Sequence, residues 1–218
     1  LMWLAASLVI VACALGASYW WVEHGPSVYE GVAVPARIAP LTVLIADFDN
    51  ATNDALFENT LEEALQIGLE GASFISVYPR YEARAQTNTE DLTIENAFLA
   101  ANRSGVQLVI TGSISADGEG YLLNIEGRET ISGKERFSLT EQVPDKLSML
   151  SEIGDVSGQA RKLLGDVDIE NNHIAESLTA TTLEAAAHYF KGQELQTNWQ
   201  LDEAIVEYNK ALVLDPEM

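Results

Sequence analysis

The first 22 residues constrain this chain more than any other segment, because they contain no charged side chain. They read LMWLAASLVIVACALGASYWWV. About 20 apolar residues in a helix cross the hydrocarbon core of a bilayer. Trp20 and Trp21, near the end of the run, belong to the residue type that settles at a membrane–water interface. We therefore predict a transmembrane helix over residues 1–22, with the lipid bilayer as its partner.

Two other kinds of leader compete with this prediction. A cleaved signal peptide would have a basic start and a shorter apolar core, and the run shows neither. A lipoprotein signal is the second alternative, because Ile10-Val11-Ala12-Cys13 loosely fits a lipobox. The residues after Cys13 stay uncharged as far as Val22, whereas a mature lipoprotein starts with a polar tether. The sequence favours the transmembrane helix over both.

Charge narrows the class of partner. The chain has 33 Asp and Glu against 12 Lys and Arg, a formal net charge of −21. Such a surface repels phosphate backbones, so we expect no nucleic-acid partner, and it favours basic ones. Cys13 is the one cysteine, which excludes an internal disulfide. Residues 23–40 are rich in proline and glycine and predict an extended linker.

Residues 41–167 alternate between strand and helix patterns and predict one α/β domain, a mixed sheet with packed helices. The order is β-α-β-α-α-β-β-β-α. Apolar runs and turn residues predict strands at 41–48, 73–78, 106–115, 121–128 and 135–142. Periodic apolar positions and helix-ending signals predict helices at 54–70, 81–85, 92–103 and 145–164.

The start of this domain resembles the TolB amino-terminal-like family. An apolar strand is followed by a turn of the D-F-x-N-x-T-x-D type, with Asp47, Asn50, Thr52 and Asp54 at the polar positions, and then by a helix with L-x-x-A-L. The stretch VQLVITGSISADGEGYLLNIEGRETISGKE is similar to the family's later strands. The resemblance implies an extracytoplasmic domain of a bacterial one-pass membrane protein. It indicates the fold better than the function.

Residues 183–218, after a polar connector at 168–182, resemble a tetratricopeptide repeat. Such a repeat is a pair of antiparallel helices with small or apolar residues where they interlock. The positions that agree are Gly192, Ala204, Tyr208, Ala211 and Pro216, whereas His188 and Leu195 depart from the usual Trp and Tyr. We expect His188 to fill a packing position. Since one repeat cannot bury its apolar face alone, we expect further repeats after Met218, in a chain that is itself a fragment.

The sequence contains only partial matches to patterns for catalysis, cofactors or metals. Asp47, Asp49 and Glu58 match part of a calcium loop, but Ala51 and Thr52 stand where a ligand and a glycine are needed. The glycines of 127–134 are spaced wrongly for a phosphate loop. The three histidines are scattered. The acidic helix face of Glu58, Glu62 and Glu63 predicts solvated surface rather than paired catalytic carboxylates.

We therefore expect no catalytic residue, cofactor or metal in these residues, and hence no enzyme. The main hypothesis is an inner-membrane sensory or scaffold segment that binds a protein or peptide through the α/β domain and the repeats, on the extracytoplasmic side. The alternatives are the outer tail of a serine/threonine kinase whose catalytic domain precedes Leu1, or of a CadC-like membrane-tethered transcription regulator. The sequence leaves the ligand and the oligomeric state open.

Overall fold

The computed structural model of the chain describes residues 39–166 and 180–218. The predicted transmembrane helix, most of the linker and most of the connector lie outside these residues and stay predictions. Among the helices of the described residues, none is both long and apolar enough to cross a bilayer.

The elements are β1 (Leu41–Ile45), β2 (Asp49–Asn50), η1 (Ala55–Phe57), α2 (Thr60–Glu70), β3 (Ile75–Val77), α3 (Arg80–Thr87), α4 (Ile94–Ser104), β4 (Leu108–Asp117), β5 (Gly120–Glu129), β6 (Glu135–Val143), α5 (Met149–Leu164), α6 (Leu183–Thr197) and α7 (Leu201–Leu214).

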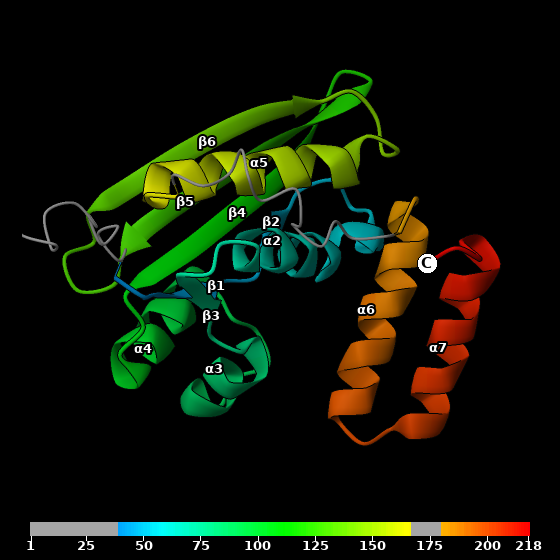
Figure 1. The fold of residues 1–218 in the computed structure, drawn as a ribbon, viewed down its shortest axis with the longest axis horizontal. Coiled ribbons are helices and arrows are strands. Elements are labelled where there is room, and N and C mark those ends of the chain that lie inside the picture. The colour runs from blue at the N-terminus through cyan, green and yellow to red at the C-terminus, as the bar shows by residue number, and fades with distance from the viewer. Residues whose placement is uncertain (1–38, 167–179) are drawn as a thin grey trace, which may run out of the picture. The chain divides into compact units, whose positions relative to one another are not determined.

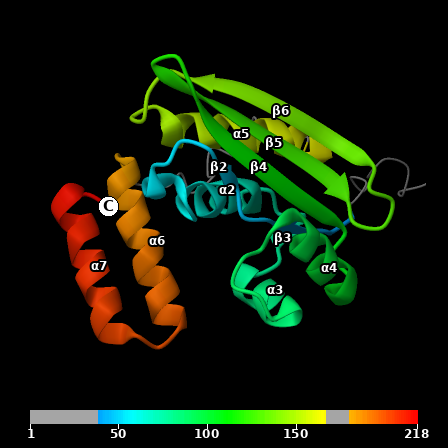
Figure 2. The ribbon, with the colours of Figure 1, turned by 180° about the vertical axis from the view of Figure 1, so that it is seen from behind.

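A single mixed sheet organises residues 39–166. Its strand order is β3-β1-β4-β5-β6, and the short β2 also pairs with β4. β1 runs parallel to β3 and β4, whereas β5 runs antiparallel to both β4 and β6. The predicted mixed sheet with packed helices is therefore confirmed. Figures 1 and 2 show α5 lying across the long strands β4, β5 and β6.

The apolar run of β1 is buried on both faces because successive side chains of a strand point to opposite sides. Val43 and Ile45 join one core cluster, to which α2 and α5 contribute. Leu44 joins a second cluster with side chains from α3 and α4. This double burial explains why the strand reads as continuous apolar residues rather than as an alternating pattern.

The first predicted strand, 41–48, ends earlier than expected, at Ile45. Beyond it, the backbone N–H of Asp47 donates to the carbonyl of Leu92, and that of Phe48 donates to the Glu62 carboxylate. The chain then pairs with β4 again through β2. The Phe48 ring lies against Gly112 so closely that a Cβ at position 112 would be 2.5 Å from it.

The predicted helix 54–70 is also divided. Asp54 caps the short η1 helix by accepting the N–H of Leu56, and Asn59, with a φ of 60°, separates η1 from α2. The break lets Phe57 turn into the core, where its ring packs edge-on against Tyr121 at 5.1 Å between centroids. In a continuous helix, the side chain of Phe57 would point in a different direction.

The last described elements, α6 and α7, form a helical hairpin. The ring of Tyr208 lies over Gly192, where a Cβ would come within 2.5 Å of it. Asp215 accepts hydrogen bonds from the backbone N–H and hydroxyl of Thr181, which ties the end of α7 to the start of α6. His188, expected at a packing position, has a side chain that is about a third exposed and lies 2.6 Å from Glu207 of α7, so its contact between the helices is polar.

Candidate functional site

The candidate site lies where the chain leaves the carboxyl end of β1. Open α/β sheets bind ligands at this edge, because loops and helix ends converge there. Asp47 lies two residues after the end of β1, Glu62 and Glu63 lie in the first turn of α2, and Arg80 is the first residue of α3. The fold thus gathers ionisable side chains from three separate elements at one edge of the sheet.

Arg80 is the centre of this group. Its side chain is 5% exposed, and its guanidinium pairs with Asp47, with Glu62 at 3.8 Å and with Glu63 at 3.5 Å. It also donates to the side-chain oxygen of Asn59 at 3.0 Å. Its Nε is buried without a hydrogen-bond partner among the described residues, but the carboxylates around it offset the charge, which a buried arginine requires. Arg80 therefore fastens α3 to β1 and α2.

Arg84 supports the same carboxylate from the next turn of α3. It lies four residues after Arg80, on the same helix face, and its Nη2 is 3.0 Å from Asp47 Oδ1. The other oxygen of Asp47 accepts the backbone N–H of Leu92 at 2.6 Å. Burial works to raise the pKa of Asp47, but the charge of Arg80 and these hydrogen bonds outweigh it, so the pKa is lowered.

The prediction of a solvated acidic face at Glu58, Glu62 and Glu63 is wrong for Glu62. Its side chain is only 3% exposed. Oε1 accepts the N–H of Phe48 at 2.8 Å, whereas Oε2 is buried with no hydrogen-bond partner among the described residues. Burial raises the pKa of Glu62, although the charge of Arg80 and the Phe48 hydrogen bond oppose the rise.

Sequence reasoning could have found Glu62 but had little access to Arg80. Glu62 stands three residues before Leu65 and seven before Leu69, both fully buried, so helical periodicity places it at the edge of the apolar stripe. Its charge outweighed this signal in our prediction. Arg80 gave no local signal, because its partners are 33, 18 and 17 positions away in the sequence.

A cleft of about 1430 Å³ opens beside this charged group. One wall comes from residues around α2 and α3, and the other from α6 and the turn that follows it. Aromatic side chains from both walls line the cleft, and they are Phe48, Tyr81, Phe190 and Trp199. Tyr81 and Trp199 are 57% and 85% exposed, so much of their apolar surface remains available for contact.

The cleft is strongly acidic. Its lining includes the carboxylates of Asp47, Glu58, Glu62, Glu63, Glu90, Asp91 and Glu194, and its cationic residues are Arg80 and Arg84. Both arginines are already paired with Asp47. Glu62 and Glu63 also pair with Arg80, and Glu194 pairs with Lys191. The exposed carboxylates at positions 58, 90 and 91 remain as hydrogen-bond acceptors for a positively charged group.

The other polar residues of the predicted turn motif form a separate, local network. Asn50 Oδ1 accepts the backbone N–H of Thr52 at 3.0 Å and its hydroxyl at 2.6 Å. Thr52 Oγ1 accepts the N–H of Asp54 at 3.2 Å. The Asp54 carboxylate caps η1 and pairs with Lys146. These contacts shape the turn that leads into α2, while Asp47 belongs to the charged group.

The predicted repeat-packing positions lie within the hairpin. Gly192, Ala204 and Ala211 are buried, Tyr208 is half-buried between the helices, and Pro216 is exposed just after α7. The hydroxyl of Tyr208 donates to Gln196 at 2.7 Å. An exposed apolar stripe remains on α7, formed by Leu201, Ile205 and Leu212.

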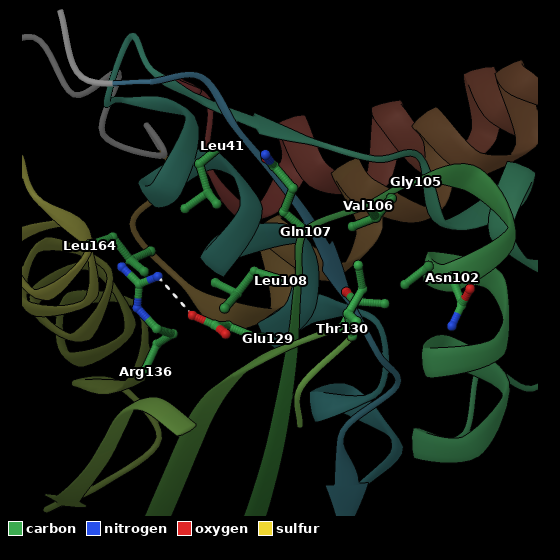
Figure 3. Close-up of a pocket in the computed structure, with 12 residues that line it drawn as sticks. Leu41, Asn102, Gly105, Val106, Gln107, Leu108, Glu129, Thr130, Arg136 and Leu164 are labelled. Carbon is green, nitrogen blue, oxygen red and sulfur yellow. Dashed lines mark hydrogen bonds and ion pairs between the residues drawn. The ribbon is translucent and has the colours of Figure 1, made fainter. Parts of the chain in front are cut away.

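A second, smaller cavity of about 310 Å³ lies at the opposite, amino end of β1 and β4. Figure 3 shows Leu41, Leu108 and Val106 around it, with the Arg136–Glu129 ion pair at 3.1 Å on one side. Thr130 Oγ1 is buried there without a hydrogen-bond partner among the described residues. The lining is mainly apolar and neighbouring Ile131 is 95% exposed, so this cavity carries less recognition chemistry than the acidic cleft.

The described residues contain no group of three or more His, Cys, Asp or Glu side chains placed to hold a metal ion. The Asp47, Glu62 and Glu63 carboxylates instead surround Arg80, so their geometry suits ion pairing. What the cleft offers chemically is recognition, through carboxylate acceptors beside aromatic surfaces.

Comparison with known proteins finds solved structures that resemble this chain at low sequence identity. No family model matches the chain, and no curated protein matches it. Solved structures that resemble it include the LpoB C-terminal domain from Salmonella enterica, at 22% identity and a TM-score of 0.43, covering 50% of this chain and 86% of that one. Lipoprotein GNA1162 from Neisseria meningitidis has 13% identity and a TM-score of 0.44 over 59% and 99% of the two chains. TolB from Acinetobacter baumannii has 13% identity and a TM-score of 0.38, covering 66% of this chain and 30% of that one.

Proposed function

We propose that this chain is a membrane-anchored, extracytoplasmic module that binds another protein, and that the acidic cleft is its recognition surface. The observation that carries the proposal is the cleft itself, with exposed aromatic side chains on two walls contributed by different elements. Protein interfaces concentrate binding energy in such anchors, with Trp, Tyr and Arg enriched among them. A cleft of this size can accept an extended peptide segment.

Trp199 supports this proposal through its backbone. It stands in the turn between α6 and α7 with a φ of 61°, in the left-handed region, and its side chain is 85% exposed. That conformation costs a bulky L-residue about 1–2 kcal/mol. Since the side chain packs little within the fold, folding alone gives no reason for tryptophan at this position. Contact with a partner supplies one.

The anchor and the location rest on the sequence. The uncharged run 1–22 supports membrane anchoring, and the resemblance to the TolB amino-terminal-like domain supports an extracytoplasmic position. The identity of α6 and α7 as the first tetratricopeptide repeat is likewise part of the proposal, supported by Gly192 and Tyr208 at the interlocking positions. The signalling output, kinase or transcription regulator, concerns sequence before Leu1 and stays a prediction.

Peptide selection tests the binding proposal directly. The full chain, held in non-ionic detergent because residues 1–22 are apolar, is panned against a displayed library of random peptides. We expect selected peptides whose binding falls at least about tenfold with Trp199→Asn, because a buried aromatic anchor contributes about 2 kcal/mol or more. Asparagine tolerates a positive φ, so the turn should keep its shape.

The matched control removes an exposed apolar residue at the other end of the sheet. Ile131→Ser lies beside the second cavity and changes a side chain that is 95% exposed. It should leave the selected peptides bound as before. Selection of no peptide, or of peptides that respond to Ile131→Ser and ignore Trp199→Asn, would remove the acidic cleft as the recognition surface.

A further inference from the structure

We propose that the segment recognised by the acidic cleft is cationic: an extended stretch of a partner protein that carries lysine or arginine side chains. This inference rests on the proposed function and specifies the chemistry of the partner. Four features support it, namely unpaired carboxylates in the cleft lining, a buried unpaired oxygen, the aromatic surfaces beside them, and the charge of the rest of the chain.

Three carboxylates of the cleft lining have no ion pair among the described residues. Glu63 pairs with Arg80 at 3.5 Å and Glu194 with Lys191 at 2.8 Å, so neither of these belongs to the three. The three are Glu58, Glu90 and Asp91, and they are exposed. Carboxylates that share a cleft repel one another, and a cation placed between them removes that repulsion.

Glu62 gives a second, independent indication. It lines the cleft, its side chain is 3% exposed, and its Oε2 has no hydrogen-bond partner among the described residues. An unpaired buried carboxylate oxygen is costly. A donor that reaches the floor of the cleft from a bound segment would satisfy it. The feature distinguishes this cleft from an acidic patch on an ordinary solvated surface.

The aromatic surfaces decide between kinds of cation. The described carboxylates do not gather into a metal-binding group. Tyr81 and Trp199 stand beside them on the rim. Lysine and arginine have long apolar stems with a charged end, and they bind aromatic faces through cation–π contact. A peptide that carries these side chains can bind both the carboxylates and the aromatic side chains of the lining, whereas a metal ion would bind only the carboxylates.

The chain itself does not supply such a segment. Residues 1–38 contain one basic residue, Arg37, and residues 167–179 contain none. A second copy would bring a formal charge of −21 toward an acidic cleft. Like charges on this scale oppose association. Residues 1–218 therefore do not supply the occupant, and the occupant that we propose is a segment of a basic partner protein.

The test uses a short labelled peptide in which lysine alternates with threonine, titrated against the full chain in non-ionic detergent. Threonine favours an extended backbone and keeps the peptide out of the micelle. We expect binding that weakens as salt rises, since salt screens exposed charges. Glu58→Gln and Glu90→Gln should each weaken it about two- to fivefold, the range measured for single exposed charges.

Matched controls make the outcome specific. Glu203→Gln removes the same charge from an exposed position of α7 outside the cleft lining and should change nothing. A glutamate–threonine peptide should not bind. The inference is overturned if that peptide binds equally, if Glu203→Gln acts like Glu58→Gln, if free spermine competes as well as the peptide does, or if the lysine–threonine peptide fails to bind.

Failure of this inference can be told apart from failure of the proposed function. If panning yields peptides that depend on Trp199 and lack basic residues, the cleft is a protein-binding surface and its cationic preference is wrong. If panning yields no peptide that depends on Trp199, the proposed function itself is wrong. If the panned peptides are basic and lose at least about tenfold in affinity when their lysines and arginines become glutamine, both stand.

Discussion

Arg80 and Asp47 form an ion pair that joins the first turn of α3 to the residue just beyond the end of β1, across 33 positions of sequence. The arginine side chain is 5% exposed, and its charge is also shared with Glu62 and Glu63. One buried cation thus holds three carboxylates on the floor of the cleft. The stability of this edge of the sheet and the charge of the cleft depend on the same side chain.

Arg80→Met should lower the free energy of unfolding by about 3–5 kcal/mol, because it leaves buried carboxylates without their cation. Urea unfolding of the full chain, followed by circular dichroism, measures the change. Arg128→Met is the control. Arg128 pairs with Glu126 and Glu135 on the surface, with a side chain that is 40% exposed, so its loss should cost about 1 kcal/mol or less. Equal costs for the two variants would contradict the buried role of Arg80.

Glu62→Gln should reduce the pH dependence of stability. Burial raises the pKa of Glu62 in the folded chain, so the folded state binds this proton more tightly than the unfolded state does. Its contribution to the free energy of unfolding therefore increases as pH falls from neutral through the folded-state pKa, and becomes constant below the unfolded-state pKa. The lowered pKa of Asp47 acts only at lower pH, where its contribution is lost on protonation.

The measurement compares urea unfolding at about pH 7 and about pH 5. The natural chain should gain stability at the lower pH, and Glu62→Gln should gain less. Some gain should persist, because burial also raises the pKa of Glu63. Glu203→Gln, on the exposed side of α7, should behave as the natural chain does. An unchanged gain in Glu62→Gln would show that Glu62 is solvated after all.

Gly112→Ala should destabilise the α/β domain by about 1–3 kcal/mol, the usual range for overpacking. The added methyl group would lie 2.5 Å from the Phe48 ring. Gly154→Ala is the opposite case, because it lies inside α5 with no atom within 4 Å of the new Cβ. It should stabilise the chain by about 0.5–1 kcal/mol through helix propensity. Thermal unfolding of both variants checks the contrast.

Local patterns predicted the sheet and its helices because each strand or helix is indicated by residues that are close together in the sequence. The doubly buried β1 reads as an apolar run, and Asp117 to Gly120 reads as the turn between β4 and β5. The charged group was not predictable in the same way. Its geometry depends on Arg80 meeting Asp47 and Glu62, and nothing in the flanking residues of any of them records that contact.

The cleft was missed for a related reason. Its walls come from segments that are far apart in the sequence, residues 47–91 and 190–201, and Trp199 gives no sequence signal that its backbone takes a positive φ. The break at Asn59 shows the limit of periodicity as well. The apolar stripe continues through Phe57 and Leu61, yet Asp54 caps a separate short helix. Periodicity specified which side chains are buried but not the path of the backbone.

Trp199→Asn should leave the hairpin as stable as before, or more stable by about 1 kcal/mol, because asparagine tolerates the left-handed region and little packing is lost. Gly192→Ala should destabilise the hairpin, since its Cβ would lie 2.5 Å from Tyr208. Circular dichroism of the thermal transition compares them. Loss of peptide binding in Trp199→Asn together with unchanged stability would separate recognition from folding, whereas a destabilised Trp199→Asn would assign the residue a structural role.

Amide hydrogen exchange of the full chain, with and without a panned peptide bound, tests the central claim most directly. If the acidic cleft is the recognition surface, the peptide should slow exchange at residues 79–84 and at 196–201, on its two walls. Exchange at residues 129–131, beside the second cavity, should not change. Protection confined to 129–131, with the two walls of the cleft unaffected, would contradict the account.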